Sequence, residues 1–414
     1  MTTRSHWLQV TGCTLALLLA SAAAQAELDA KELLGKALFF DTTLSTPSGQ
    51  SCAVCHTSEV GWTGPDSAIN AHGAVYEGAV IGRFGNRKPP SSAYATPSPI
   101  LHFSRQGGGL FIGGNFWDGR ATGEKLGNPA ADQAQGPFLN PLEQNNDSPQ
   151  VVCDKVSVSG FALELTGYSY SSLFDMAFGA GSLDCLNDTN GTYDRVALAI
   201  AAYEGSSEVN RFTSKYDRYL AGTEPLTPQE LHGLRLFDGK AKCARCHASR
   251  PGPKGEPPLF TDFTYDNLGV PRNPENPFYT QTEFNPLGVN WIDLGLGDFL
   301  ASRIDYERYA PANYGKQKVP TLRNVDKRPY PGFVKAFAHN GYFKSLESIV
   351  HFYNTRDVKP RCPDAFTTEA MALAQGCWPA PEVAANVNTT ELGNLRLTST
   401  EEDALVAFLR ALSD

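Results

Sequence analysis

The chain has 414 residues and a formal net charge of −9 at pH 7, with 44 acidic against 35 basic side chains. This balance argues against a nucleic-acid partner, because binding to a phosphate backbone requires clustered basic side chains. Beyond the first residues no apolar run approaches the ~20 residues of a membrane-spanning helix, so we expect no membrane span. The length is enough for two domains of ordinary size.

Residues 1–26 have the pattern of a secretory signal peptide. Arg4 is their only charged residue, an apolar run extends from Leu15 to Ala24, and small residues around Gln25 suit a signal peptidase. We therefore expect cleavage near Ala26 and a periplasmic mature protein.

Two similar segments then begin the two halves of the chain. Residues 32–41 (ELLGKALFFD) and 230–238 (ELHGLRLFD) each have the periodicity of an amphipathic helix, and each follows a capping-box start. Each is followed by a CxxCH pentapeptide, at residues 52–56 and 243–247. This internal repeat predicts two related domains.

A CxxCH motif is typical of covalent haem attachment, because its thiols form thioether bonds to the haem and its histidine binds the iron. His56 and His247 are therefore the expected proximal ligands of two haem c groups. The expected attachment residues are Cys52, Cys55, Cys243 and Cys246. A redox pair or half of a zinc site is the alternative for one copy, but not for two copies behind an export signal.

Each half is predicted to end in another helix, at residues 193–203 and 400–412, and residues 222–228 supply turn and cap residues between the halves. Strand-like alternation is scarce. We predict a mainly α protein of two cytochrome c-like haem domains with long loops, the domains being residues 27–222 and 223–414.

Four cysteines remain in the mature chain outside the two motifs. In an oxidising compartment we pair them locally, although three pairings are possible and sequence does not choose among them. The local pairs are Cys153 with Cys185 and Cys362 with Cys377.

Methionine is the commonest partner of histidine at an electron-transfer haem. Met176 and Met371 are the only methionines of the mature chain, and neither has the context of an iron ligand. A high-potential His/Met haem is therefore not expected.

Over nearly all of its mature length the chain resembles the bacterial dihaem cytochrome c peroxidases and MauG. The resemblance rests on both CxxCH motifs and on residues 116–120 (FWDGR), 133–143, 319–325 (VPTLRNV), 339–341 (HNG) and 345–347 (SLE). It implies two covalent haem c groups, hydrogen peroxide as oxidant, and a partner protein that is oxidised or donates electrons.

The resemblance assigns four residues to catalysis. Trp117 matches a tryptophan between the haems that relays oxidising equivalents, although it could be an ordinary core residue. Glu143 matches the distal carboxylate that moves the peroxide proton, as general acid–base chemistry requires; its alternative is a solvated loop residue. Gln133 and Pro137 match that pocket too, but extra residues after Trp117 depart from the family's spacing.

Tyr353 falls where conventional peroxidases carry a methionine ligand and MauG carries tyrosine. A tyrosinate stabilises oxidised iron, so the resemblance implies a low-potential second haem; the alternative is that Tyr353 only packs against the haem edge. His72 resembles the gating histidine that caps the first haem in conventional peroxidases, but a surface role is favoured, and His102 is a weaker candidate.

The family usually holds a calcium ion between its haem domains, which implies one Ca²⁺ here. Asn86 matches the side-chain ligand, and the carbonyls of Val334 and Ala336 stand where the family has threonine and proline. Oxygen ligands of this kind suit Ca²⁺.

Three functions are compatible with these features. The MauG-like function, favoured by the missing His/Met haem, forms a high-valent dihaem state that oxidises a partner protein at Trp or Tyr. Residues 113–123 and 362–393 look like MauG relatives of the MbnH type, encoded beside copper-binding proteins. The alternatives are a conventional peroxidase supplied by a small cytochrome or cupredoxin, and a dihaem electron carrier.

Overall fold

The computed structural model describes residues 27–106 and 108–414, so the predicted signal peptide lies outside the described residues. The described chain is mainly helical, and its two sheets have two strands each. Among its helices, none combines the length and the apolar character that crossing a membrane requires.

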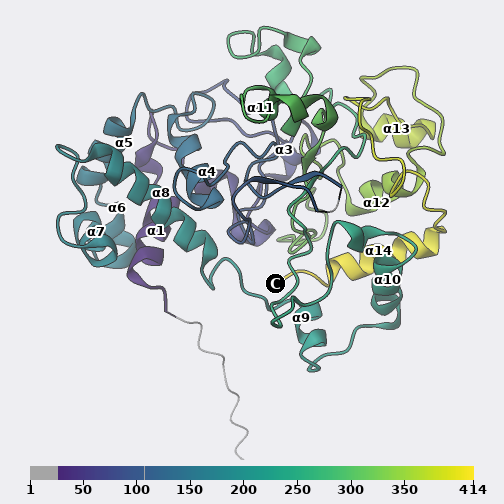
Figure 1. The fold of residues 1–414 in the computed structure, drawn as a ribbon, viewed down its shortest axis with the longest axis horizontal. Helices are drawn as coiled ribbons and strands as arrows, with labels where there is room; N and C mark the ends of the chain where they lie inside the picture. The colour runs from purple at the N-terminus through teal and green to yellow at the C-terminus, as the bar shows by residue number, and fades with distance from the viewer. Residues whose placement is uncertain (1–26, 107) are drawn as a thin grey trace, which may run out of the picture.

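Most helices of the first half gather at one end of the molecule, and most helices of the second half gather at the other (Figure 1). Those of the first half are α1 (Ala30–Phe40), α2 (Cys52–Cys55), α3 (Ser67–Ala71), α4 (Pro129–Leu139), α5 (Pro149–Val158), α6 (Phe161–Thr166), α7 (Tyr170–Phe178), α8 (Thr189–Gly205) and α9 (Lys215–Leu220). Those of the second half are α10 (Pro228–Asp238), α11 (Leu296–Ala301), α12 (Leu346–Thr355), α13 (Glu369–Gln375) and α14 (Ser399–Arg410).

The repeated helix of each half packs against the closing helix of the same half, α1 on α8 and α10 on α14. The predicted capping boxes are present at Asp29 and Thr227. Both crossings need glycine. A Cβ atom added at Gly35 would lie 1.9 Å from the carbonyl oxygen of Ala199, and a Cβ atom added at Gly233 would lie 2.0 Å from the carbonyl oxygen of Ala404. The repeat seen in the sequence thus corresponds to the same close crossing of two helices in each half.

Each crossing lies within its own hydrophobic core. The first core is built from residues of the segment 34–209 and the second from residues of the segment 216–412. A third, smaller core joins the long loops, and its buried members are Leu101, Phe111, Tyr265, Leu296, Leu300 and Ala310.

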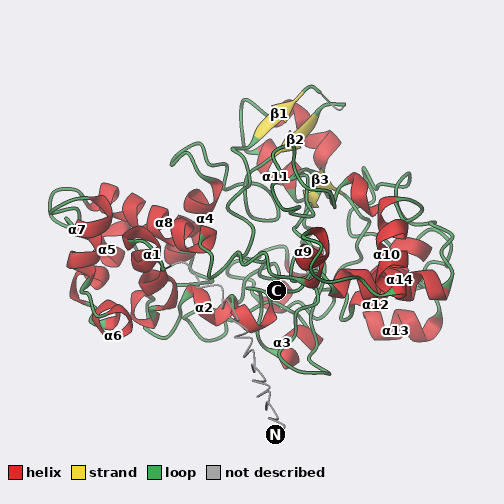
Figure 2. Cartoon of the chain, turned by 90° about the horizontal axis from the view of Figure 1, so that it is seen from below, coloured by secondary structure: helices red, strands yellow, loops and turns green. Residues whose placement is uncertain are grey.

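The third core lies beside both small sheets. Strands β1 (His102–Ser104) and β2 (Leu110–Ile112) are antiparallel, as are β3 (Tyr265–Asp266) and β4 (Gln317–Lys318). Figure 2 shows β1, β2 and α11 together, apart from the two helical ends. The predicted long loops therefore pack into a compact unit that sequence periodicity did not reveal.

Both predicted disulfides are present. Cys153 pairs with Cys185, and Cys362 pairs with Cys377. The first joins α5 to the segment that leads into α8, and the second closes the loop that contains α13. The local pairing is confirmed.

Candidate haem sites and the region between them

A cavity lies beside each CxxCH motif, and both motifs present unpaired thiols to it. In the first, the Nδ1–H of His56 donates to the carbonyl of Trp62 at 3.1 Å, and in the second that of His247 donates to the carbonyl of Phe260 at 2.7 Å. This bond leaves Nε2 of each ring as the free ligand atom, which is the usual arrangement of a metal-binding histidine.

Burial keeps both imidazoles neutral. It lowers the pKa of His56 to about 4, and it lowers the pKa of His247 as well. A neutral ring offers the lone pair that a metal needs. Two free thiols and one neutral, oriented histidine beside a cavity fit covalent haem c at both motifs.

One wall of the first cavity comes from α4. Gln133 and Pro137 stand one helical turn apart and both line the cavity. Asn140 ends the helix as its C-cap, and its Nδ2 donates to Oε1 of Glu143 at 2.8 Å. The three predicted residues Gln133, Pro137 and Glu143 are thus brought to the same cavity as His56.

The carboxyl group of Glu143 is held away from water. Burial raises its pKa, although Arg120 and the Asn140 amide act in the opposite direction. A carboxyl group with a raised pKa carries its proton into the neutral range more readily than an ordinary one. Glu143 is therefore able to give up or accept a proton inside the cavity.

Trp117 lines both cavities and is 9% exposed. Its Nε1–H donates to the carbonyl of Lys88 at 2.9 Å, which fixes the ring, and the His339 ring centroid is 6.4 Å from its own. Residues 318–321 also line both cavities. The two haem sites thus share one wall, and Trp117 is its aromatic member.

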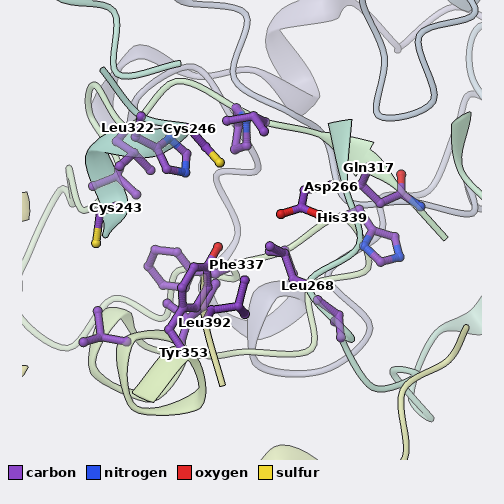
Figure 3. Close-up of a pocket in the computed structure, with 18 of the residues that line it drawn as sticks. Cys243, Cys246, Asp266, Leu268, Gln317, Leu322, Phe337, His339, Tyr353 and Leu392 are labelled. Carbon is purple, nitrogen blue, oxygen red and sulfur yellow. The ribbon is translucent and has the colours of Figure 1, made fainter. Parts of the chain in front are cut away.

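The side chain of Tyr353 on α12 lines the second cavity. Figure 3 shows it across the cavity from Cys246, with its ring rising into the open space. Burial raises the pKa of its phenol, whereas a bound ferric iron would act in the opposite direction and favour the phenolate. Met176 and Met371 are about half exposed, and neither lines a cavity.

Neither of the two candidate histidines for the first haem lies at its cavity. The His72 side chain is 71% exposed, and its Nδ1 is 2.8 Å from Oε1 of Glu275. His102 is exposed on β1, where its Nδ1 donates to the carbonyl of Ile100 at 2.8 Å. The structure therefore argues against ligation by His72, because its hydrogen bond with Glu275 holds it at the surface.

The calcium site predicted from Asn86 and the carbonyls of Val334 and Ala336 stays a prediction. The Val334 carbonyl already accepts from Nδ2 of Asn70 at 3.1 Å, and the residue between the two carbonyl donors, Lys335, is a lysine 4% exposed. Asn86 lines the first haem cavity, and its carbonyl accepts from Nδ2 of Asn276 at 2.9 Å.

Three ionisable residues at the cavities were missed in the sequence. Glu204 on α8 lines the first cavity, and burial raises its pKa to about 8. Lys88 and Lys318 line both cavities, and burial lowers their pKa to about 8 and about 7. Glu204 follows Ile200 by four residues on an apolar face, which was a usable signal; the lysines, in loops, gave none.

Known proteins similar to this chain are dihaem peroxidases, which agrees with the two haem sites described above. A family model described as di-haem cytochrome c peroxidase matches residues 29–225. The chain is 36% identical over 387 residues to the methylamine utilization protein MauG of Paracoccus denitrificans (strain Pd 1222), covering 93% of this chain and 89% of that one. It is 28% identical over 391 residues to the cytochrome-c peroxidase IdrP2 of Denitromonas iodatirespirans, covering 92% and 80%.

Among solved structures, the diheme peroxidase BthA from Burkholderia thailandensis E264 superposes with a TM-score of 0.73 at 31% identity, covering 94% of this chain and 87% of that one. The haem-binding motifs, the helical fold and relatives above 30% identity over most of the chain lead to one conclusion. The protein belongs to the di-haem cytochrome c peroxidase family and is a dihaem peroxidase with two c-type haems.

Proposed function

We propose that this peroxidase is of the MauG-like type and uses hydrogen peroxide to oxidise a partner protein in the periplasm, at a tryptophan or tyrosine of that partner. The haems, when bound, supply iron that reacts with peroxide and takes up oxidising equivalents. The observation that carries the proposal is Tyr353, which faces the second CxxCH motif where a methionine would mark an electron-transfer haem.

Glu143 is the proposed acid–base group of the first cavity. Its raised pKa makes the carboxylate a stronger base, so it can take the proton from the oxygen of peroxide that is retained and give it to the other oxygen, which leaves as water. The Asn140 amide holds Oε1 at 2.8 Å and so keeps the carboxyl group in one orientation. Gln133 and Pro137 complete the wall and limit the water that enters.

Trp117 is the proposed relay between the sites. Its indole lies in the wall that the cavities share, and its N–H bond to Lys88 keeps the ring in place. We further propose that residues 27–222 and 223–414 form two cytochrome c-like domains, with Tyr216 of α9 packing into the second core.

The test adds one equivalent of hydrogen peroxide to the oxidised holoprotein without any reductant and records the visible and near-infrared spectra. We expect a near-infrared band that reports oxidation shared by both haems. Tyr353→Phe removes the proposed ligand and should abolish the band. Tyr330→Phe is the matched control, because Tyr330 is 54% exposed and lines neither cavity.

The main alternative is a conventional cytochrome c peroxidase, a function borne by relatives such as IdrP2. It predicts no reaction until one haem has been reduced by a small electron donor. A spectrum unchanged by peroxide in the oxidised protein, with rapid turnover after half-reduction, would reject the MauG-like proposal. A protein inert in both states would be an electron carrier.

A further inference from the structure

Tyr94 is a second oxidisable side chain that connects the two haem sites. It is 1% exposed and lines the first cavity. Arg323 lies over its ring, with the central guanidinium carbon 5.0 Å from the ring centroid, and Arg323 lines the second cavity. The ring of Tyr94 therefore links the wall of one haem site to the wall of the other by a path that does not include Trp117.

The phenol of Tyr94 is hydrogen-bonded to a carboxylate. Its O–H donates to Oδ2 of Asp414 at 2.5 Å, and its oxygen accepts from the N–H of Phe212 at 3.1 Å. Burial, followed by the negative charge of Asp414, raises the pKa of the phenol well above its usual range, so the phenol carries its proton at neutral pH. A proton that leaves this phenol thus has an acceptor already in place.

The positive charge of Arg323 determines how Tyr94 can be oxidised. Its guanidinium is buried and donates to both carboxylate oxygens of Asp217, at 2.8 and 2.9 Å, and arginine stays charged in proteins. A tyrosine that lost only an electron would become a cation beside this fixed charge, which is unfavourable in a buried site. A tyrosine that loses its electron and its proton together becomes neutral, and Asp414 makes this second route available.

Trp117 differs from Tyr94 in the group that accepts its hydrogen bond. Its Nε1–H donates to the backbone carbonyl of Lys88 at 2.9 Å, and a neutral carbonyl is too weak a base to take the proton. An oxidised Trp117 therefore keeps its proton and readily takes an electron back, as a relay must. An oxidised Tyr94 would be trapped as a neutral radical by the transfer of its proton.

We infer that Tyr94 is a redox-active residue that stores one of the two oxidising equivalents of hydrogen peroxide as a neutral tyrosyl radical, with Asp414 as its proton acceptor. In this step the phenolic O–H bond breaks, the electron passes to the oxidised first haem site, and the proton forms an O–H bond on the Asp414 carboxylate. Peroxide is the oxidant and takes two electrons in all as it is reduced to water, and Tyr94 supplies one of them.

The burial of Tyr94 suits storage, because a ring that is 1% exposed is shielded from small reductants in the solvent. The inference rests on the proposed reaction of peroxide at the first haem, but it does not require Tyr353 to bind the second iron.

The test is electron paramagnetic resonance of holoprotein frozen at intervals after it is mixed with one equivalent of hydrogen peroxide. We expect a tyrosyl signal whose hyperfine splitting collapses when the tyrosines are ring-deuterated, and Tyr94→Phe should lose this signal. Tyr170→Phe is the matched control, because Tyr170 is also buried and donates to the carboxylate of Asp41 at 2.9 Å, but lines neither cavity. A missing signal in the unmodified protein, or an unchanged one in Tyr94→Phe, would overturn the inference.

Asp414→Asn tests the proton acceptor separately. Asparagine keeps the size of the side chain but removes the base, so the yield of the tyrosyl signal should fall while Tyr94 is still present. A yield equal to that of the unmodified protein would overturn the assignment of Asp414. This variant also decides the matter if Tyr94→Phe does not fold, which its Tm and the resting haem signals would show.

The tyrosyl signal and the near-infrared band answer different questions. If the fully oxidised protein does not react with peroxide, the MauG-like proposal fails, and the freezing experiment is repeated on half-reduced protein. A tyrosyl signal in that state, absent from Tyr94→Phe, would support the inference although the proposed function had failed. A protein inert to peroxide in both states would overturn both.

Discussion

Gly233→Ala should force apart the two helices that enclose the second haem. The new Cβ would lie 2.0 Å from the carbonyl oxygen of Ala404 and 2.7 Å from Cβ of Phe408, whereas ordinary contacts of a Cβ begin at 3.4 Å. Helix α10 therefore has to move by about 1.4 Å from a backbone atom that no side-chain rotation can displace.

Two opposing effects determine how much Gly233→Ala lowers the free energy of unfolding. Overpacking of this kind costs about 3 kcal/mol at the upper end of its usual range. Replacing a mid-helix glycine by alanine returns about 1 kcal/mol. The net loss of about 2 kcal/mol corresponds to a Tm lower by roughly 4–8 °C in a domain of 150–250 residues.

The displacement should also be visible at the haem. Leu405 and Leu409 of α14 line the second cavity, so Gly233→Ala should alter the spectrum of the second haem. Gly35→Ala should act on the first haem instead, because Ile200 of the facing helix lines the first cavity. Electron paramagnetic resonance of the oxidised protein separates the two haem signals.

The matched control is Gly160→Ala. Gly160 is the N-cap of α6 at φ −84°, and nothing lies within 4 Å of an added Cβ there. Circular dichroism at 222 nm gives the Tm of all three variants. If Gly233→Ala melts within a degree of Gly160→Ala with both haem signals unchanged, the close helix crossing does not shape the haem site and the reasoning fails.

Three further predictions concern single side chains at or near the first haem. Glu143→Gln should slow peroxide consumption by about 10²–10⁴-fold, because it removes the proton-transfer group, and an unchanged rate in stopped-flow measurements would exclude that role. His72→Ala should leave the spectrum of the first haem unchanged, since the side chain is 71% exposed, and a new open-site signal would show that it binds the iron. The pKa of Glu204, raised by burial from 4.5 to about 8, means that the folded protein binds more protons than the unfolded chain between these pH values. The free energy of unfolding of the protein should therefore fall as the pH rises through this range. Glu204→Gln should make the Tm depend less on pH in a series from pH 5 to 8. Parallel slopes for native protein and variant would contradict it.

Local signals account for what the sequence predicted well. The capping boxes at Asp29 and Thr227 and the apolar periodicity after them set α1 and α10, because these effects act within a few residues. The two disulfides are likewise local pairings. The CxxCH motifs contain both the thiols and the histidine that bind haem, so a haem cavity was expected beside each motif whatever the rest of the fold.

Long-range contacts account for what the sequence did not predict. The third core brings together Leu101 and Leu296, which are nearly two hundred residues apart in the sequence and come from two segments without a periodic pattern. The bonds of Lys335 are to backbone carbonyls, which every residue possesses, so no residue type could reveal them. The surface position of His72 depends on Glu275, a partner that spacing from the haem motif could not identify.

The wall that the two haem cavities share has a consequence for how the protein is made. Trp117 comes from the first half and residues 318–321 come from the second, so neither cavity is closed until the halves have met. The thiols of both motifs must react with haem while they are accessible, which places covalent attachment before this closure. We therefore expect haem attachment at both motifs to precede the docking of the two halves.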